Sequence, residues 1–155
     1  RVSGRVLEPD GVTGAANVSI HAIAQDATGG SWLPLDEVDG VTAADGTFEL
    51  PMDPGVWRFE FLPGIETPLS SRLVTIPAEG AGQPVPLADV VLSRGRTVSG
   101  VVTATVTAAK PTEASYAQLR FFRVQNFAGV PASILLGTAT ADAHGNYQVL
   151  LPTAK

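Results

Sequence analysis

The only two imidazoles in the sequence belong to His21 and His144, and neither stands in a pattern typical of catalysis. A serine-type triad needs a histidine that shuttles a proton between an exposed nucleophile and an orienting carboxylate. No nucleophile elbow accompanies either residue, since His21 falls on the outward face of an expected strand and His144 in an expected turn. Zinc ligands come in clusters, and no carboxylates cluster around either histidine. We therefore expect no catalytic residue, no metal ligand and no cofactor, and a chain that is not an enzyme.

Four carboxylates lie within ten positions, in a segment that contains Asp36, Glu37 and Asp39 and ends at Asp45. Calcium takes several oxygen ligands at about 2.3–2.6 Å, which a loop of carboxylates supplies when its oxygens converge. The spacing does not follow the pattern of an EF-hand loop. We therefore expect a solvated acidic loop, with a calcium site as the alternative.

Trp32 follows a Gly-Gly-Ser turn and precedes the carboxylates of Asp36 and Glu37. Modules that bind sugars need aromatic platforms that stack on pyranose rings, with amides or carboxylates nearby for the hydroxyls. Trp32, Asp36 and Glu37 are therefore the candidate ligand-binding residues, and a polysaccharide is their candidate ligand. The competing interpretation is structural, because the amphipathic indole of a tryptophan often covers one end of a core. We expect the structural role and keep the polysaccharide site as the alternative.

The composition limits the partners that the chain can bind. Its 155 residues include 10 basic and 15 acidic side chains, which gives a net charge of −5 at neutral pH. Nucleic acids and anionic lipids are bound by clustered basic residues, so we expect neither as a partner. The sequence has no cysteine, which excludes disulfides and thiolate chemistry. No apolar run reaches the roughly 20 residues of a membrane helix, so we expect no membrane insertion within this chain.

The sequence repeats itself about a hundred positions apart. Val-Ser-Gly-Arg-Val at 2–6 returns as Val-Ser-Gly-Val-Val at 98–102, and Asp-Gly-Thr-Phe-Glu-Leu at 45–50 returns as His-Gly-Asn-Tyr-Gln-Val at 144–149. The offset is 96 positions for the first pair and 99 for the second, so one three-residue insertion brings the copies into register. A period of this length is typical of tandem domains rather than of a solenoid.

Short apolar segments with a period of two, separated by turn residues, predict a chain made of strands. The 16 glycines and 12 prolines among 45 % hydrophobic residues are typical of an all-β protein. No segment has the 3.6-residue period of a capped helix. We therefore expect two tandem antiparallel β-sandwich modules, at residues 1–93 and 96–155, with almost no helix. The expected strands are 2–7, 18–23, 31–35, 41–43, 48–50, 56–61, 72–76, 87–92, 98–106, 117–124, 134–140 and 146–151.

Aromatic residues mark the expected cores, and an Asp-Gly pair marks the clearest turn. Trp57, Phe59 and Phe61 alternate along one strand and should fill the first core. Phe121 and Tyr147 should do the same in the second module, whereas Phe122 is out of phase and should belong to an exposed or inter-module patch. Asp45-Gly46 predicts a hairpin between the strands at 41–43 and 48–50.

The second copy lacks counterparts of the last three strands of the first. Its sheet edges and part of its apolar interior should therefore be exposed. Unpaired edges recruit partner strands. We expect the second copy to pack against the first module, to pair with a neighbouring chain in a weak self-association through an edge strand, or to be the less stable half.

Several motifs together carry a resemblance to a known family. They are Val-Ser-Gly-x-Val at 2–6, Gly-x-x-Gly-Ala at 11–15, Thr-x-x-Asp-Gly-x-Phe at 42–48 and Pro-Gly-x-Trp at 54–57. On these motifs the chain resembles the carboxypeptidase regulatory-like family, well over residues 2–92 and in part over 98–151. The resemblance implies a transthyretin-like, or prealbumin-like, β-sandwich of immunoglobulin-like architecture, which occurs as tandem modules in bacterial surface and secreted proteins.

These motifs belong to the scaffold, and a fold does not by itself imply a function. We expect a non-catalytic spacer or interaction module of a larger exported bacterial cell-surface protein, with another protein or a polysaccharide as its ligand. The alternatives are a carbohydrate-binding module attached to an enzyme and an accessory domain of a peptidase. We expect an extracellular, cell-surface or periplasmic location, with any signal peptide or lipid anchor upstream of Arg1.

Overall fold

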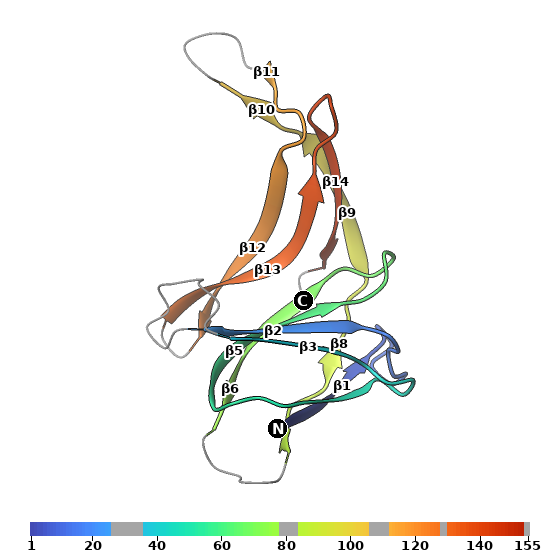
Figure 1. Ribbon diagram of the computed structural model, residues 1–155. Helices are drawn as coiled ribbons and strands as arrows, with labels where there is room; N and C mark the ends of the chain where they lie inside the picture. Colours follow the sequence, from blue (N-terminus) through green and yellow to red (C-terminus); the bar gives the residue numbers. More distant parts are fainter. Residues whose placement is uncertain (26–35, 78–83, 106–111, 128–129, 154–155) are drawn as a thin grey trace.

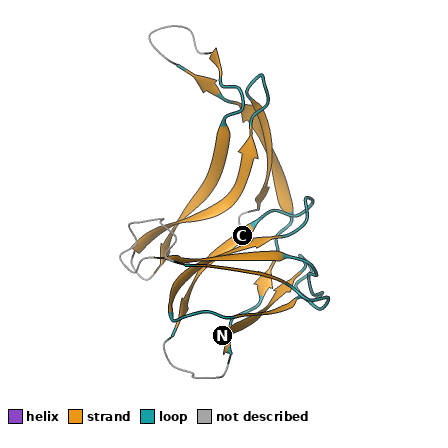
Figure 2. Ribbon diagram, in the orientation of Figure 1, coloured by secondary structure: helices purple, strands orange, loops and turns teal. Residues whose placement is uncertain are grey.

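The computed structural model describes residues 1–25, 36–77, 84–105, 112–127 and 130–153. Within these ranges the chain forms strands and no helix, which confirms the all-β prediction (Figure 2). None of the described segments is a helix long and apolar enough to cross a membrane. The expected strand at 31–35 lies outside the described residues.

Two sheets enclose one core in the first half of the chain (Figure 1). An antiparallel four-stranded sheet has the order β3 (Glu37–Val41), β2 (Ser19–Gln25), β5 (Gly55–Leu62) and β6 (Ser70–Ile76). The other sheet is built on β1 (Val2–Leu7), which pairs antiparallel with β4 (Thr47–Leu50) and parallel with the short β7 (Val85–Pro86) and β8 (Val90–Val91).

Alternation of apolar and polar residues gives the strands of the first half one face toward the core. On β5, Trp57, Phe59 and Phe61 are at most 2 % exposed, as predicted. The Phe61 ring lies 6.1 Å from the ring of Phe48 in the other sheet, so aromatic contact joins the two layers. The other buried members of this core are Val2, Val6, Ala15, Val18, Ile20, Ala22, Leu50, Ile76, Val90 and Leu92.

The turn at Asp45 and Gly46 does not form the predicted hairpin. The turn itself is tight, because the N–H of Gly46 donates to the carbonyl of Ala43. However, β3 ends at Val41 and pairs with β2, whereas β4 pairs with β1. The turn therefore carries the chain from one sheet to the other. Local residues determine the turn, but long-range pairing decides which strands it joins.

The strand predicted at 87–92 is reduced to the two-residue strand β8, and the equally short β7 lies just before the predicted segment. Both run parallel to β1, and the pairing is interrupted between them. In the interruption the carbonyl of Ala88 accepts a hydrogen bond from the Arg72 guanidinium at 2.6 Å. The Arg72 side chain thus uses a backbone carbonyl that would otherwise be available to a continuous strand ladder.

The second half consists of paired strands. β9 (Gly95–Val101) pairs with β14 (Asn146–Pro152), β12 (Gln118–Phe127) with β13 (Val130–Thr140), and β10 (Thr103–Ala104) with β11 (Thr112–Glu113), all antiparallel. The expected strand at 98–106 is thus two strands, β9 and β10.

Strand register and turn geometry recur between the halves with the offsets of the sequence repeat. The φ angle is 56° at Asn17 and 58° at Tyr116, and it is 80° at Gly46 and 78° at Gly145. Residues that lie opposite each other recur as well, in the pairs Val2–Leu50 and Val98–Val149, Gly4–Phe48 and Gly100–Tyr147, Ile20–Gly40 and Leu119–Ala139, and Ala22–Val38 and Phe121–Gly137.

Core positions of the first half are less buried in the second. Phe48 is 6 % exposed, whereas its counterpart Tyr147 is half-buried, as is Phe121. The rings of Phe121 and Tyr147 lie 5.8 Å apart, so the two residues contact each other, but their predicted burial is incomplete. Phe122 is 47 % exposed, as predicted. The core positions of the second half are less buried because β5 to β8 have no counterparts among its described residues.

The two halves contact each other through β13, which packs beside β6 (Figure 1). Ala132 and Ile134 of β13 are 7 % and 2 % exposed. The loop after β5 and strands β13 and β14 also enclose a hollow of about 350 Å³ lined by Leu69, Val149 and their neighbours. The second half therefore buries part of its apolar surface against the first.

Candidate functional site

The residues predicted to bind a ligand lie at an edge of the four-stranded sheet or outside the described structure. Trp32 lies outside the described residues, so its role stays a prediction. Asp36 and Glu37 are exposed where the edge strand β3 begins. An oxygen of the Asp36 carboxylate accepts the N–H of Glu37 at 2.9 Å, and the Asp36 carbonyl accepts the N–H of Ala24. The edge thus presents two adjacent carboxylates to solvent.

The other two carboxylates of the acidic segment are engaged elsewhere. Asp39 Oδ1 lies 2.5 Å from Nδ1 of His21 on the neighbouring strand. Asp45 Oδ1 accepts the N–H and the hydroxyl of Thr47 at 3.0 Å and 2.6 Å. In the described part of the chain, no three histidine or acidic side chains are grouped so that they could hold a metal ion. The described carboxylates of this segment therefore do not converge on one cation.

His21 belongs to a row of polar residues on the face of the four-stranded sheet that points away from the core. Its partners in register are Asp39 on β3 and Glu60 on β5, and Glu60 lies opposite Ser71 on β6. Ser71 is thus two strands from His21, which is about 10 Å at ordinary strand spacing. A hydroxyl at that distance cannot pass its proton directly to the imidazole, so the row is not a nucleophile, base and carboxylate triad.

Arg58 and Glu60 form a buried ion pair that the sequence analysis did not identify. The two residues are two positions apart on β5 and therefore share a face. Arg58 Nη2 lies 2.8 Å from Glu60 Oε1, and the side chains are only 13 % and 9 % exposed. Removing one partner of such a pair leaves a buried charge uncompensated. Because Arg58 and Glu60 alternate with three core aromatics, the sequence predicts that they share the opposite face of the strand. No local sequence pattern predicts that other residues bury this face.

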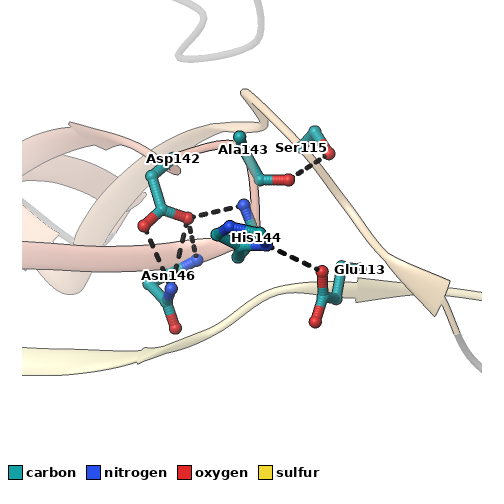
Figure 3. A network of polar contacts seen from close by, with 6 residues as sticks. All are labelled: Glu113, Ser115, Asp142, Ala143, His144 and Asn146. Atoms are coloured by element: carbon teal, nitrogen blue, oxygen red, sulfur yellow. Dashed lines mark hydrogen bonds and ion pairs between the residues drawn. The ribbon is translucent and has the colours of Figure 1, made fainter.

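His144 lies in the turn between β13 and β14, within an exposed polar network (Figure 3). Its Nδ1 is 3.5 Å from an oxygen of Glu113, and the two side chains are 76 % and 59 % exposed. Ser115 is part of the same network, but its hydroxyl donates to the carbonyl of Ala143 at 2.6 Å. A serine, a histidine and a glutamate are thus close together without the bond from nucleophile to base that covalent catalysis requires.

Asp142 organises the turn that holds His144. Its carboxylate accepts the N–H groups of His144 and Asn146 at 2.8 Å and 2.9 Å, and the side-chain amide of Asn146 at 3.0 Å. The hydrogen bonds from Asn146, its side chain foremost, hold the pKa of Asp142 below its usual range. In the first half the hydroxyl and N–H of Thr47 lower the pKa of Asp45 in the same way. Both carboxylates stabilise turns.

A hollow of about 730 Å³ lies beside β1 and β4 and is lined by polar and apolar groups. Its Arg5 donates to the carbonyl of Val12 at 3.2 Å, and its Glu49 accepts a hydrogen bond from Arg1 at 2.9 Å. Asp89, also in the lining, is exposed. The hollow therefore has no buried charged group that would select a ligand.

The edge of β12 is the accessible feature that the sequence analysis predicted from the missing counterparts. β12 pairs with β13 and with no second strand among the described residues. Phe122 and Val124 on this strand are 47 % and 72 % exposed. The edge combines unpaired backbone groups with apolar side chains, which is the chemistry of a strand-binding surface.

No family model and no curated protein matches the chain. The resemblance to the carboxypeptidase regulatory-like family thus stays a prediction based on the motifs of the sequence.

Proposed function

We propose that the chain is a non-catalytic pair of tandem β-sandwich modules, at residues 1–93 and 96–155, in a larger exported bacterial cell-surface protein. Its role is that of a spacer or interaction segment. The observation that carries the proposal is that strand register and turns recur between the halves, whereas the contact of His21 with Asp39 has no counterpart among the described residues of the second half. His21 corresponds to Arg120, and Asp39 to Thr138. Duplication of a working site would keep its side chains, whereas duplication of a scaffold keeps turns and apolar alternation.

Contact between two of the family motifs supports the assignment to the carboxypeptidase regulatory-like family. Gly14 of the Gly-x-x-Gly-Ala motif lies against the turn at Asp45 and Gly46. A Cβ on Gly14 would stand 1.9 Å from the carbonyl oxygen of Asp45. Because only glycine allows this approach, the two motifs are parts of one packing arrangement.

The proposal is tested by assaying the intact chain against ester, peptide and glycoside substrates. We expect no turnover above the buffer rate, because among the described residues neither imidazole has a hydrogen bond to a nucleophile. The variants His21→Ala and His144→Ala serve as controls and should behave like the parent. Turnover by the parent that disappears in either variant would contradict the proposal.

The exposed carboxylates of Asp36 and Glu37 favour a second candidate, a carbohydrate-binding module attached to an enzyme. Retention of the intact chain on insoluble polysaccharides distinguishes the two candidates. For the spacer we expect no retention, together with a marked loss of stability in Trp32→Ala. For the binding module, Trp32→Ala and a double Asp36→Ala, Glu37→Ala variant should lose retention while the free energy of unfolding changes by less than about 1 kcal/mol.

A further inference from the structure

The open edge of β12 corresponds to an edge that is occupied in the first half. β2 lies between β3 and β5 in the four-stranded sheet. Its counterpart β12 pairs with β13, the counterpart of β3, in the same register. On the other side of β12 the described part of the chain provides no strand (Figure 1). The first half therefore shows which element fits this edge and in which direction it runs.

Backbone groups of alternate β12 residues point out of this edge. The N–H of Ala141 donates to the carbonyl of Ala117, so the groups of Ala117 and Leu119 face β13. By alternation, the N–H and carbonyl groups of Gln118 and Arg120 face the open side. Both residues are exposed. An added strand would find unpaired donors and acceptors there.

Apolar side chains beside the edge are incompletely covered. In the first half, Phe61 and Phe59 of β5 lie opposite Ile20 and Ala22, which are at most 1 % exposed. The counterparts of those two covered residues on β12, of which Phe121 is one, are half-buried. An added strand with bulky apolar residues at alternate positions would cover them.

The charge of β12 indicates which strand fits. β12 contains Arg120 and Arg123 and no acidic residue. Antiparallel pairing with a second copy of β12 would bring these like charges together, which is unfavourable. In the first half the counterpart of Arg120 is His21, and Glu60 of β5 lies opposite it. A carboxylate at that place would give Arg120 an opposite charge.

We infer that the open edge of β12 binds an extended strand of another protein, antiparallel to β12. This strand carries apolar residues opposite Leu119 and Phe121 and an acidic residue opposite Arg120. Its backbone hydrogen bonds provide affinity, and its alternate side chains provide specificity. Phe121 is larger than Ala22, so the residue opposite it is smaller than the phenylalanine at the equivalent place in β5. The inference rests on the proposed interaction role and names its partner.

The probe is a fluorescent peptide of residues 55–62 with Phe59→Val, titrated against the intact chain and followed by anisotropy. We expect saturable binding of one peptide per chain. Arg120→Glu should weaken peptide binding about ten-fold, because the attractive cross-strand pair of Arg120 with Glu60 of the peptide becomes a repulsive pair of carboxylates. A peptide that also carries Glu60→Lys should regain the lost affinity with Arg120→Glu and bind the parent less tightly.

A second pair of variants tests the backbone hydrogen bonds. Arg120→Pro removes an N–H on the open side and leaves the ladder to β13 intact, so binding should fall at least about ten-fold. Arg120→Ala keeps that N–H and should lose no more than about five-fold. If Arg120→Pro does not fold, the charge exchange decides alone.

The inference is overturned by any of three results: no peptide binding, equal affinities of Arg120→Pro and Arg120→Ala, or a peptide preference that does not follow the charge exchange. A dimer of the parent that Arg120→Pro dissociates also overturns it, because the edge would then belong to a second copy. Any of these results would contradict only the inference about β12 and would leave the proposed non-catalytic scaffold unaffected. Turnover by the parent would contradict the proposed function but would not bear on strand binding at β12.

Discussion

Several polar side chains of this chain bond to the backbone that surrounds them. Thr42 is 2 % exposed, and its hydroxyl accepts the N–H of Val18 at 2.9 Å and donates to the carbonyl of Ala15 at 2.6 Å. The Asp10 carboxylate accepts the N–H groups of Val12 and Thr13, each at 2.9 Å. Such side chains satisfy backbone groups at turns, where no ladder reaches them. At the residue scale the polar groups therefore maintain the shape of the connections.

The carboxylate of Asp142 should make the stability of the chain depend on pH in the acidic range. Its folded pKa is lowered from the usual 3.8, so its contribution is present above that value and is lost as the pH falls through the folded pKa. Asp142→Asn keeps an acceptor oxygen and removes the titration. We expect the free energy of unfolding of the parent to fall more steeply below pH 3.8 than that of the variant. Urea unfolding at a series of pH values measures this difference.

A matched variant at another acidic site serves as the control for this titration. Glu66 is exposed in the turn where the N–H of Thr67 donates to the carbonyl of Gly64, and its carboxylate accepts no hydrogen bond from the described residues. Glu66→Gln should therefore follow the pH dependence of the parent. Parallel curves for the parent and Asp142→Asn would show that the hydrogen bonds of this turn do not favour the ionised carboxyl.

At the scale of elements, the turn between the two sheets should be the connection least tolerant of change. Gly46 has φ of 80°, and a Cβ there would lie 2.2 Å from the carbonyl oxygen of Val6. Gly46→Ala therefore adds a collision with the backbone to the strain of a left-handed conformation. We expect a loss of more than about 2 kcal/mol in the free energy of unfolding, measured in urea.

Gly11→Ala separates the two contributions. Gly11 has φ of 74°, but no atom lies within 4 Å of the position of an added Cβ. This variant should lose only about 1 kcal/mol, the usual cost of a left-handed alanine. Equal losses at Gly11 and Gly46 would mean that the chain relaxes around the Val6 carbonyl.

Most strands were predictable because a period of two is a local property of the sequence. The expected segments at 2–7, 56–61 and 146–151 differ from β1, β5 and β14 by no more than one residue at either end. What failed depends on distant partners. The turn at 45–46 joins different sheets because β3 before it pairs with β2 and β4 after it pairs with β1. The segment at 87–92 pairs with β1 only at β8.

The candidate sites divide in the same way. The outward position of His21 and the exposure of Phe122 follow from alternation along single strands. The burial of the Arg58 and Glu60 pair depends on contacts with other elements, and the sequence pattern along a single strand does not predict such contacts. The open edge of β12 was predictable because the repeat itself shows which strands are missing.

At the scale of the whole molecule, the two halves should differ in stability. The first half encloses a core whose members Val2 and Phe59 are fully buried. In the second half, Val98 and Tyr147 are only half-buried, so opening it exposes less apolar surface. Segments with fewer buried apolar contacts open at lower free energy than the global transition. The second half should therefore open while the first stays folded.

Amide hydrogen exchange of the intact chain measures this difference segment by segment. We expect the amides that join β12 to β13 and β9 to β14 to exchange at least about ten-fold faster than those that join β2 to β5, because they open without global unfolding. The saturating peptide of residues 55–62 with Phe59→Val should slow exchange in β12 and leave β2 unchanged. Equal protection in both halves would instead mean that the contact between β13 and β6 couples them into one cooperative unit, in which neither half opens alone.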